Sequence, residues 1–146
     1  MSANVADEDR NEDLIRYLYS LAEASSKDTQ EFASLFKDDG YFYHIADGAR
    51  YCGSDVGIPV ERYCAAFPDI HRELCSFYFD DNVVVVELAL SGTHKGDLVL
   101  GTVKIPATGR RINAPCCDVI HIKDGKITSL HSYLPFTVIL AQLTSD

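Results

Sequence analysis

Apolar residues recur at helical spacing in the first half of the chain. Leucines and an alanine return every three or four positions between residues 9 and 25, and acidic residues fill the first turn, where the helix dipole favours them. A second helix is predicted to begin at Asp28, because Glu31 follows three residues later, as in a capping box, and to end before Gly40, a stop signal. Pro59, a favourable first-turn residue, predicts a third helix that stops before Pro68.

The pattern then changes to segments rich in β-branched and aromatic residues, which are typical of strands. They span residues 70–79, 82–94, 110–122 and 126–134, after an earlier aromatic segment at 40–47. Turn-forming residues such as Asp124-Gly125 separate them. Helices followed by a meander of long strands predict an α+β fold, with the helices on one face of a curved antiparallel sheet. The final apolar segment, PFTVILAQL, fits either a strand or a short helix.

The composition narrows the class of protein and of partner. With 146 residues the chain suits a single domain, 1–146, in which we expect residues 1–8 to form a flexible tail. The net charge of −9 disfavours nucleic acid and anionic membranes as partners, and no run approaches the ~18 apolar residues of a membrane span. Five cysteines, an odd number without C-x-x-C spacing, indicate buried reduced thiols and therefore a cytoplasmic protein.

Several short motifs occur in an order that resembles the SnoaL-like polyketide cyclases of the nuclear-transport-factor-2-like superfamily. The motifs are AAFPDIH, SGTHKGD, IPATGRR, DVIHIKDGKI and the terminal LAQL. The resemblance implies a cone in which a strongly bent sheet, mixed or antiparallel, and three helices from the N-terminal half enclose a pocket for an apolar small molecule. It also implies a homodimer through the outer sheet face, and ring closure by an aldol reaction without a metal or organic cofactor.

The resemblance assigns the family's active-site positions through the shared DGKI motif. The acid–base Asp of the last strand falls on Ser132, the His of the preceding strand falls on Asp118, and a further acid falls on Pro135. A serine is not a general base near neutral pH unless another group activates it. If the chain is an enzyme, the acid has therefore moved one strand back, to Asp118.

Two registers of the last hairpin remain open. A two-residue turn at Asp124-Gly125 would place Asp118 opposite His131. A bulged turn would shift the pairing by one residue, so that Asp118 shares a face with Ser132 and His131 points away. The family correspondence favours the bulged turn.

Asp118 is the leading catalytic candidate, because it lies in an apolar strand beside Cys117 and Val119. A buried carboxyl group needs a partner or titrates at high pH. One reading is a general acid or base tuned by an apolar pocket. The other is a structural carboxylate bonded to backbone or to an arginine such as Arg111.

Other candidates are histidines and hydroxyl groups. His94 and His131 would assist catalysis, although His94 also fits a strand-end turn contact and His131 also fits the dimer face. The candidates for substrate binding are Tyr19, His44, Tyr63, His71 and Ser132, each of which also fits an ordinary structural role. No H-x-H or H-x₃-H spacing occurs, so we expect no metal site.

The sequence supports functions of different classes. The first is an enzyme for cyclisation, isomerisation or dehydration of an apolar carbonyl compound. The second is a ligand-binding or accessory protein on the same scaffold. A third is a condensation helper resembling those of phenazine pathways, which also carry a Pro-Phe pair, here Pro135-Phe136, after the last strand.

Overall fold

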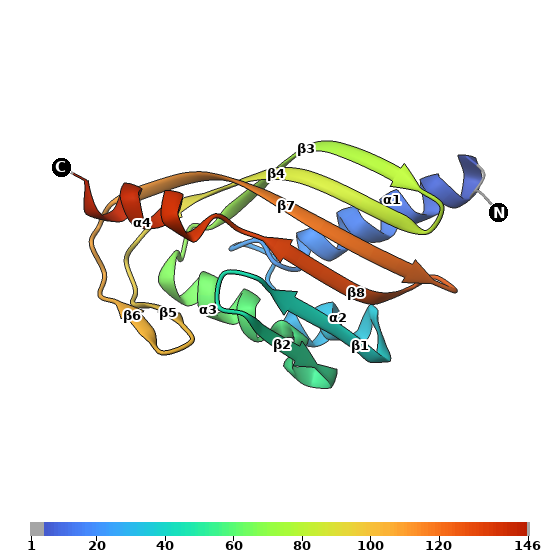
Figure 1. Ribbon diagram of the computed structural model, residues 1–146, viewed down its shortest axis with the longest axis horizontal. Helices are drawn as coiled ribbons and strands as arrows, with labels where there is room; N and C mark the ends of the chain where they lie inside the picture. The colour runs from blue at the N-terminus through green and yellow to red at the C-terminus, as the bar shows by residue number, and fades with distance from the viewer. Residues whose placement is uncertain (1–4, 146) are drawn as a thin grey trace.

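The computed structural model describes residues 5–145, and its helices and strands form the predicted α+β fold (Figure 1). The helices are α1 Val5–Ser20, α2 Thr29–Ser34, α3 Ile58–Ala66 and α4 Phe136–Thr144, with a 3₁₀ helix, η1, at Gly53–Gly57. The strands are β1 Phe36–His44, β2 Ala49–Cys52, β3 His71–Asp80, β4 Val83–Thr93, β5 Leu98–Leu100, β6 Val103–Ile105, β7 Arg111–Lys123 and β8 Lys126–Tyr133.

Six strands form one bent, open sheet in the order β2-β1-β8-β7-β4-β3 (Figure 1). All neighbours are antiparallel except β1 and β8, which run parallel, so the sheet is mixed. The parallel pair brings the end of the first strand beside the end of the last one. Residues from the N-terminal and C-terminal parts of the chain therefore lie on neighbouring strands.

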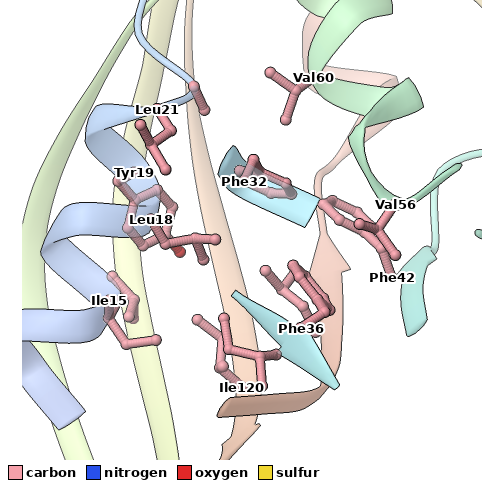
Figure 2. Packing of buried hydrophobic residues seen from close by; sticks show 14 of the residues in the cluster. Ile15, Leu18, Tyr19, Leu21, Phe32, Phe36, Phe42, Val56, Val60 and Ile120 are labelled. Atoms are coloured by element: carbon pink, nitrogen blue, oxygen red, sulfur yellow. The ribbon is translucent and has the colours of Figure 1, made fainter. Parts of the chain in front are cut away.

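One face of this sheet is covered by the first three helices. Ile15 and Leu18 of α1 and Phe32 of α2 pack in one buried cluster with inward-facing strand residues such as Ile120 (Figure 2). Each such side chain contributes about 1.5–3 kcal/mol by its removal from water. A second cluster joins α3 and α4 and includes Phe67, Ile70, Leu98, Ile139 and Leu143.

The predicted helix starts are confirmed at α2 and α3, but the second helix ends at Ser34 instead of before Gly40, because Phe36 and the residues after it belong to β1. The carboxylate of Asp28 caps α2 by accepting from the Glu31 N–H at 3.1 Å, and Pro59 lies in the first turn of α3. Helix α1 covers residues 5–20 instead of 9–25. Of the expected tail at 1–8, residues 5–8 belong to α1, and residues 1–4 lie outside the described part of the chain. The ambiguous C-terminal segment is the helix α4.

One expectation from the sequence is wrong, and three strands have no clear signal in it. The strands β2, β5 and β6 have three or four residues each, which carry too little alternation to predict a strand. The cysteines are free thiols, but contrary to expectation none of the five is fully buried. Three are partly buried, and Cys52 and Cys75 are exposed. Both lie on edge strands, and Cys75 is the unpaired residue of a bulge in β3, so its apolar neighbours do not bury it.

The β7–β8 hairpin combines both predicted registers. The turn has two residues, Asp124 and Gly125, which both have positive φ, and it pairs Lys123 with Lys126. A bulge at Thr128 then shifts the ladder, so that Asp118 pairs with Ser132. The predicted shift is thus present, but it occurs three residues after the turn.

None of the helices formed by residues 5–145 has the length and apolar character needed to cross a membrane.

Candidate functional site

The inner face of the sheet and helices α1–α3 enclose a cavity of about 50 Å³, measured as the space open to the centres of water-sized spheres. A buried water needs about 10–15 Å³ of such space, so several waters fit. Most of the wall is apolar, with side chains such as Leu18, Phe32 and Leu130. The polar or charged side chains of the wall are Tyr19, His44, Tyr63, Arg72, Cys116, Asp118 and Ser132.

Asp118 is held inside the cavity by neutral hydrogen-bond donors. Its Oδ2 accepts from the Tyr19 hydroxyl at 2.6 Å, and its Oδ1 accepts from the Cys116 thiol at 3.5 Å. Its side chain is buried, and this loss of hydration raises the pKa of the carboxyl group above its ordinary value. Interactions with Tyr19, Ser132 and Cys116, and the charge of Arg72, oppose that rise.

Helix α1 supplies the strongest donor to this acid. Tyr19 lies near the helix C-terminus on the same face as Ile15 and Leu18, so its ring packs in the core while its hydroxyl reaches β7 (Figure 2). Burial raises the pKa of Tyr19 well above its ordinary value, and the charge of Asp118 adds to the rise. Tyr19 therefore stays protonated and keeps donating.

Two further polar side chains of the wall lack hydrogen-bond partners among residues 5–145. They are His44, at both ring nitrogens, and Tyr63, at its hydroxyl. Their rings lie against one another with centroids 5.4 Å apart. Burial lowers the pKa of His44, which favours the neutral imidazole, and raises the pKa of Tyr63.

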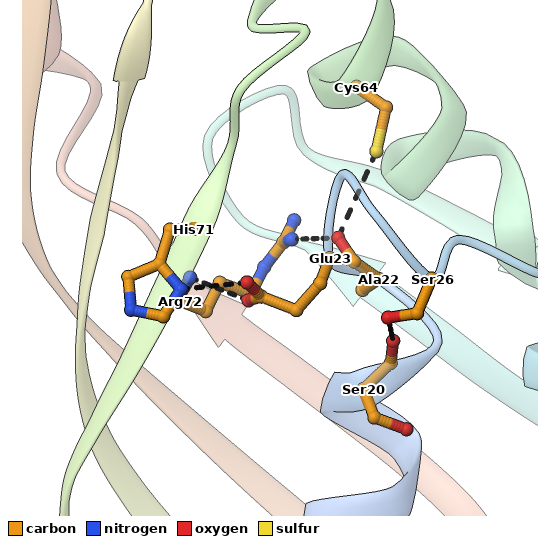
Figure 3. A network of polar contacts seen from close by, with 7 residues as sticks. All are labelled: Ser20, Ala22, Glu23, Ser26, Cys64, His71 and Arg72. Atoms are coloured by element: carbon orange, nitrogen blue, oxygen red, sulfur yellow. Dashed lines mark hydrogen bonds and ion pairs between the residues drawn. The ribbon is translucent and has the colours of Figure 1, made fainter.

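Arg72, at the start of β3, brings a cation to the cavity wall (Figure 3). Its guanidinium donates to the Ala22 carbonyl, and its backbone N–H donates to Glu23 at 2.7 Å. The same Glu23 carboxylate contacts Nδ1 of His71 at 2.7 Å. The loop after α1 therefore fixes the position of Arg72.

The structure brings only some of the predicted site residues together. Tyr19, His44, Tyr63, Asp118 and Ser132 all line the cavity. His71 does not line it: its side chain is 62% exposed and pairs with Glu23.

The two histidines expected to assist Asp118 lie elsewhere. His94 is fully buried, but it is outside the cavity lining, and its Nδ1 contacts the Thr108 hydroxyl at 2.9 Å. His131 lies on the opposite face of the sheet, where its Nε2 contacts the Tyr41 hydroxyl at 2.9 Å. Arg111, the alternative partner of Asp118, instead contacts Asp69 at 3.4 Å.

Sequence reasoning missed Arg72 and Cys116 as cavity residues. Arg72 lies beside His71, the residue type more often found in active sites, and the apolar neighbours of Cys116 fit an ordinary core position. The alternation rule could have found Cys116, because it lies two residues before Asp118 on the same strand. No group of three or more His, Cys, Asp or Glu side chains within residues 5–145 is arranged to hold a metal ion.

A bent mixed sheet and helices around a largely apolar cavity define the cone-shaped α+β fold of the nuclear-transport-factor-2-like proteins. The chain belongs to the SnoaL-like polyketide cyclase family, whose model matches residues 13–143. No curated protein shows significant sequence similarity to it.

Solved structures show the same fold at low sequence identity. A candidate SnoaL-like polyketide cyclase from Jannaschia sp. CCS1 is 12% identical, with a TM-score of 0.80 over 94% of this chain and 93% of that one. IdmH, a candidate polyketide cyclase from Streptomyces antibioticus, is 22% identical, with a TM-score of 0.74 over 92% and 99%. TerC, co-crystallised with polyporic acid, is 14% identical, with a TM-score of 0.73 over 93% and 99%.

Proposed function

We propose that the chain is an enzyme that catalyses acid–base chemistry on an apolar carbonyl compound without a cofactor. Cyclisation, isomerisation and dehydration can all begin with a proton transfer next to a carbonyl group. The observation that carries the proposal is the carboxyl group of Asp118, buried in an apolar cavity with a raised pKa. Such a group keeps its proton to a higher pH and can donate it to a carbonyl oxygen.

The hydrogen bonds around Asp118 suit both of its protonation states. As the carboxylate forms, Tyr19 continues to donate to Oδ2, and Arg72 supplies a nearby positive charge. These interactions stabilise the charge that appears when the proton leaves. The apolar wall would bind the hydrocarbon part of the substrate, for which Leu18, Phe32 and Leu130 offer surface.

The test is proton exchange on small ketones. Cyclohexanone and 2-tetralone would be incubated with the protein in D₂O, and loss of the signals from protons next to the carbonyl would be followed by ¹H NMR. We expect Asp118→Asn to lower the exchange rate by about 10²- to 10⁴-fold, the usual contribution of a general acid or base. Asp39→Asn, at an exposed carboxyl group, is the matched control and should keep the wild-type rate. Full activity in Asp118→Asn would contradict the assignment.

A second candidate function is ligand binding without turnover. It is favoured by Ser132, which occupies the position where the family resemblance assigns the acid. Polyporic acid, with which TerC was co-crystallised, is one probe for native mass spectrometry. Retention of the compound without exchange on any ketone would support this function, and observed turnover would count against it.

A further inference from the structure

His44 presents a buried imidazole without hydrogen bonds to a cavity that also holds an acid. Its side chain is 2% exposed, and neither ring nitrogen has a hydrogen-bond partner among residues 5–145. Most buried polar groups in proteins are paired, so an unpaired one calls for an explanation. A ligand in the cavity would supply the missing partner.

A buried carboxylate lies behind this imidazole. Nδ1 of His44 is 3.4 Å from Oδ1 of Asp47, whose side chain is also 2% exposed, although the alignment does not make a hydrogen bond. The Asp47 carboxylate is itself fixed, because it accepts from the Ala49 N–H at 2.9 Å and from the Tyr51 hydroxyl at 2.8 Å. A carboxylate on this side favours the proton on Nδ1 and leaves Nε2 as the acceptor.

The turn after β1 builds this pair from residues close in sequence. The Gly48 N–H donates to the His44 carbonyl at 2.9 Å, and Gly48 has a φ of 71°, which glycine adopts without strain. The turn returns the chain to β2, where Tyr51 reaches back to Asp47. The Arg62 guanidinium of α3 donates to the Tyr51 hydroxyl at 2.8 Å, and it also lies 3.9 Å from the Asp47 carboxylate.

Sheet pairing places His44 in line with Asp118. His44 pairs with Ser132 across the parallel β1–β8 ladder, and Ser132 pairs with Asp118 across β8–β7. All three are buried on the inner face of the sheet. Neighbouring strands are about 4.8 Å apart, so the backbones at His44 and Asp118 are separated by about 10 Å. The short side chain of Ser132 between them leaves space for a small substrate.

We propose that His44 is the general base of this site, that Asp47 is its positioning residue, and that Asp118 is the acid opposite. The assignment rests on the proposed acid–base function. In the first step, Nε2 of His44 takes a proton from the carbon next to the substrate carbonyl. The electron pair of that C–H bond forms the C=C bond of an enol, and the carbonyl oxygen takes the proton of Asp118. The step leaves an imidazolium and a carboxylate, and return of both protons restores the site.

The charges around His44 define how this base titrates. Burial lowers its pKa, Asp47 and Asp118 raise it, and Arg62 lowers it. The neutral form is the active base. We therefore expect the rate of ketone exchange to fall at acid pH as His44 becomes protonated.

The experiment repeats the exchange of cyclohexanone and 2-tetralone with two substitutions. His44→Gln should lower kcat by about 10²- to 10⁴-fold and abolish the acid limb of the pH–rate profile. Asp47→Asn removes a charge that holds the pKa of His44 up, so its acid limb should move to lower pH and its kcat should fall more than its KM changes. A purely structural role for Asp47 would not move that limb. His121→Gln, at an exposed histidine outside the cavity lining, is the matched control and should behave as the wild type.

The outcomes separate this inference from the proposed function. If the wild type exchanges ketone protons and Asp118→Asn does not, while a folded His44→Gln keeps the wild-type rate and profile, then His44 is not the base and the proposed function stands. If the wild type exchanges neither ketone, the proposed function and the role of His44 are both rejected. Circular dichroism of each variant distinguishes a lost base from a lost fold.

Discussion

The carboxyl group of Asp118 links stability to pH at the scale of one residue. Its pKa in the folded protein is raised by burial, so it favours folding below its unfolded pKa of about 3.9, and this contribution is lost as pH rises through the folded pKa. A pKa raised by one unit corresponds to about 1.4 kcal/mol. Asp118→Asn should therefore gain stability relative to the wild type as the pH rises from about 4 through the folded pKa of Asp118.

Urea denaturation at several pH values measures this difference. Asp39→Asn, which removes the same charge at an exposed position, controls for the net charge of the chain. A difference between Asp118→Asn and wild type that does not change with pH would mean that Asp118 titrates as it does in the unfolded chain.

The Tyr19 hydroxyl should tune the same acid. Its hydrogen bond of 2.6 Å lowers the pKa of Asp118 against the effect of burial. In Tyr19→Phe the pKa of Asp118 should therefore rise further, and the buried carboxyl group loses a donor, which should cost about 1–3 kcal/mol of folding stability. Carbon-13 NMR of labelled aspartate carboxyl groups gives the titration directly, and an unchanged midpoint for Asp118 would refute the expected coupling.

Sequence reasoning found most of these residues but not their partners. Asp118 was identifiable because a carboxyl group in an apolar strand needs an explanation. Its donor Tyr19 is 99 positions away, and nothing in the local pattern of either segment links them. His44 and Asp47 are only three positions apart in the sequence. However, α3 and β2 bury the pair, and the local sequence pattern does not predict where these two elements lie.

At the scale of elements, α2 depends on its cap. The helix has six residues, too few to be stable without packing and capping, and Asp28 accepts from the Glu31 N–H at its first turn. Asp28→Ala should lower the free energy of unfolding by about 1 kcal/mol. Urea denaturation at neutral pH tests this, with Asp39→Ala as a control that removes an equal charge from an exposed site. Equal loss in the two variants would exclude a capping effect.

Close packing at Gly96 fixes the chain after β4 against α3. The Gly96 N–H donates to the Ala66 carbonyl at 3.1 Å, and a Cβ at Gly96 would lie 2.1 Å from the Ala65 carbonyl oxygen. Gly96→Ala should therefore destabilise the fold by about 1–3 kcal/mol, as overpacking usually does. Thermal unfolding measures the loss. The neighbouring exposed residue offers a control, Lys95→Ala, which should unfold near the wild-type temperature.

The element types were largely predictable because they depend on local periodicity and caps. The long strands alternate clearly, and Asp28 and Pro59 are specific start signals. The register of the last hairpin was harder to predict. A bulge at Thr128 and a shifted turn give the same pattern of alternating residues, so the sequence does not distinguish them.

At the scale of the whole molecule, the homodimer implied by the family resemblance remains a prediction. The sheet face opposite the cavity carries Tyr78 and Tyr133, which are 52% and 48% exposed. Large exposed aromatic side chains are typical anchors of protein interfaces. We expect a second copy of the chain to bind to this face of the sheet, even though the net charge of −9 on each copy opposes association at low salt.

Sedimentation velocity tests the dimer over a range of concentrations. Tyr133→Glu should weaken it by about 2 kcal/mol, a roughly 30-fold increase in Kd. Val103→Glu is the matched control, because Val103 on β6 is also 48% exposed but lies outside the six-stranded sheet. A wild type that stays monomeric, or equal weakening by the two substitutions, would argue against this interface.

The extra residue in β8 affects how relatives of this chain should be aligned. Thr128 has no partner in the ladder, so a homologue that lacks it could run the hairpin flat and still set a serine opposite the buried acid. A homologue of equal length with a flat hairpin would present the equivalent of His131 instead. A homologue that aligns with a one-residue gap at Thr128 would thus keep the same residue opposite the buried acid. A homologue that aligns without a gap would place a different residue there if its hairpin has no bulge.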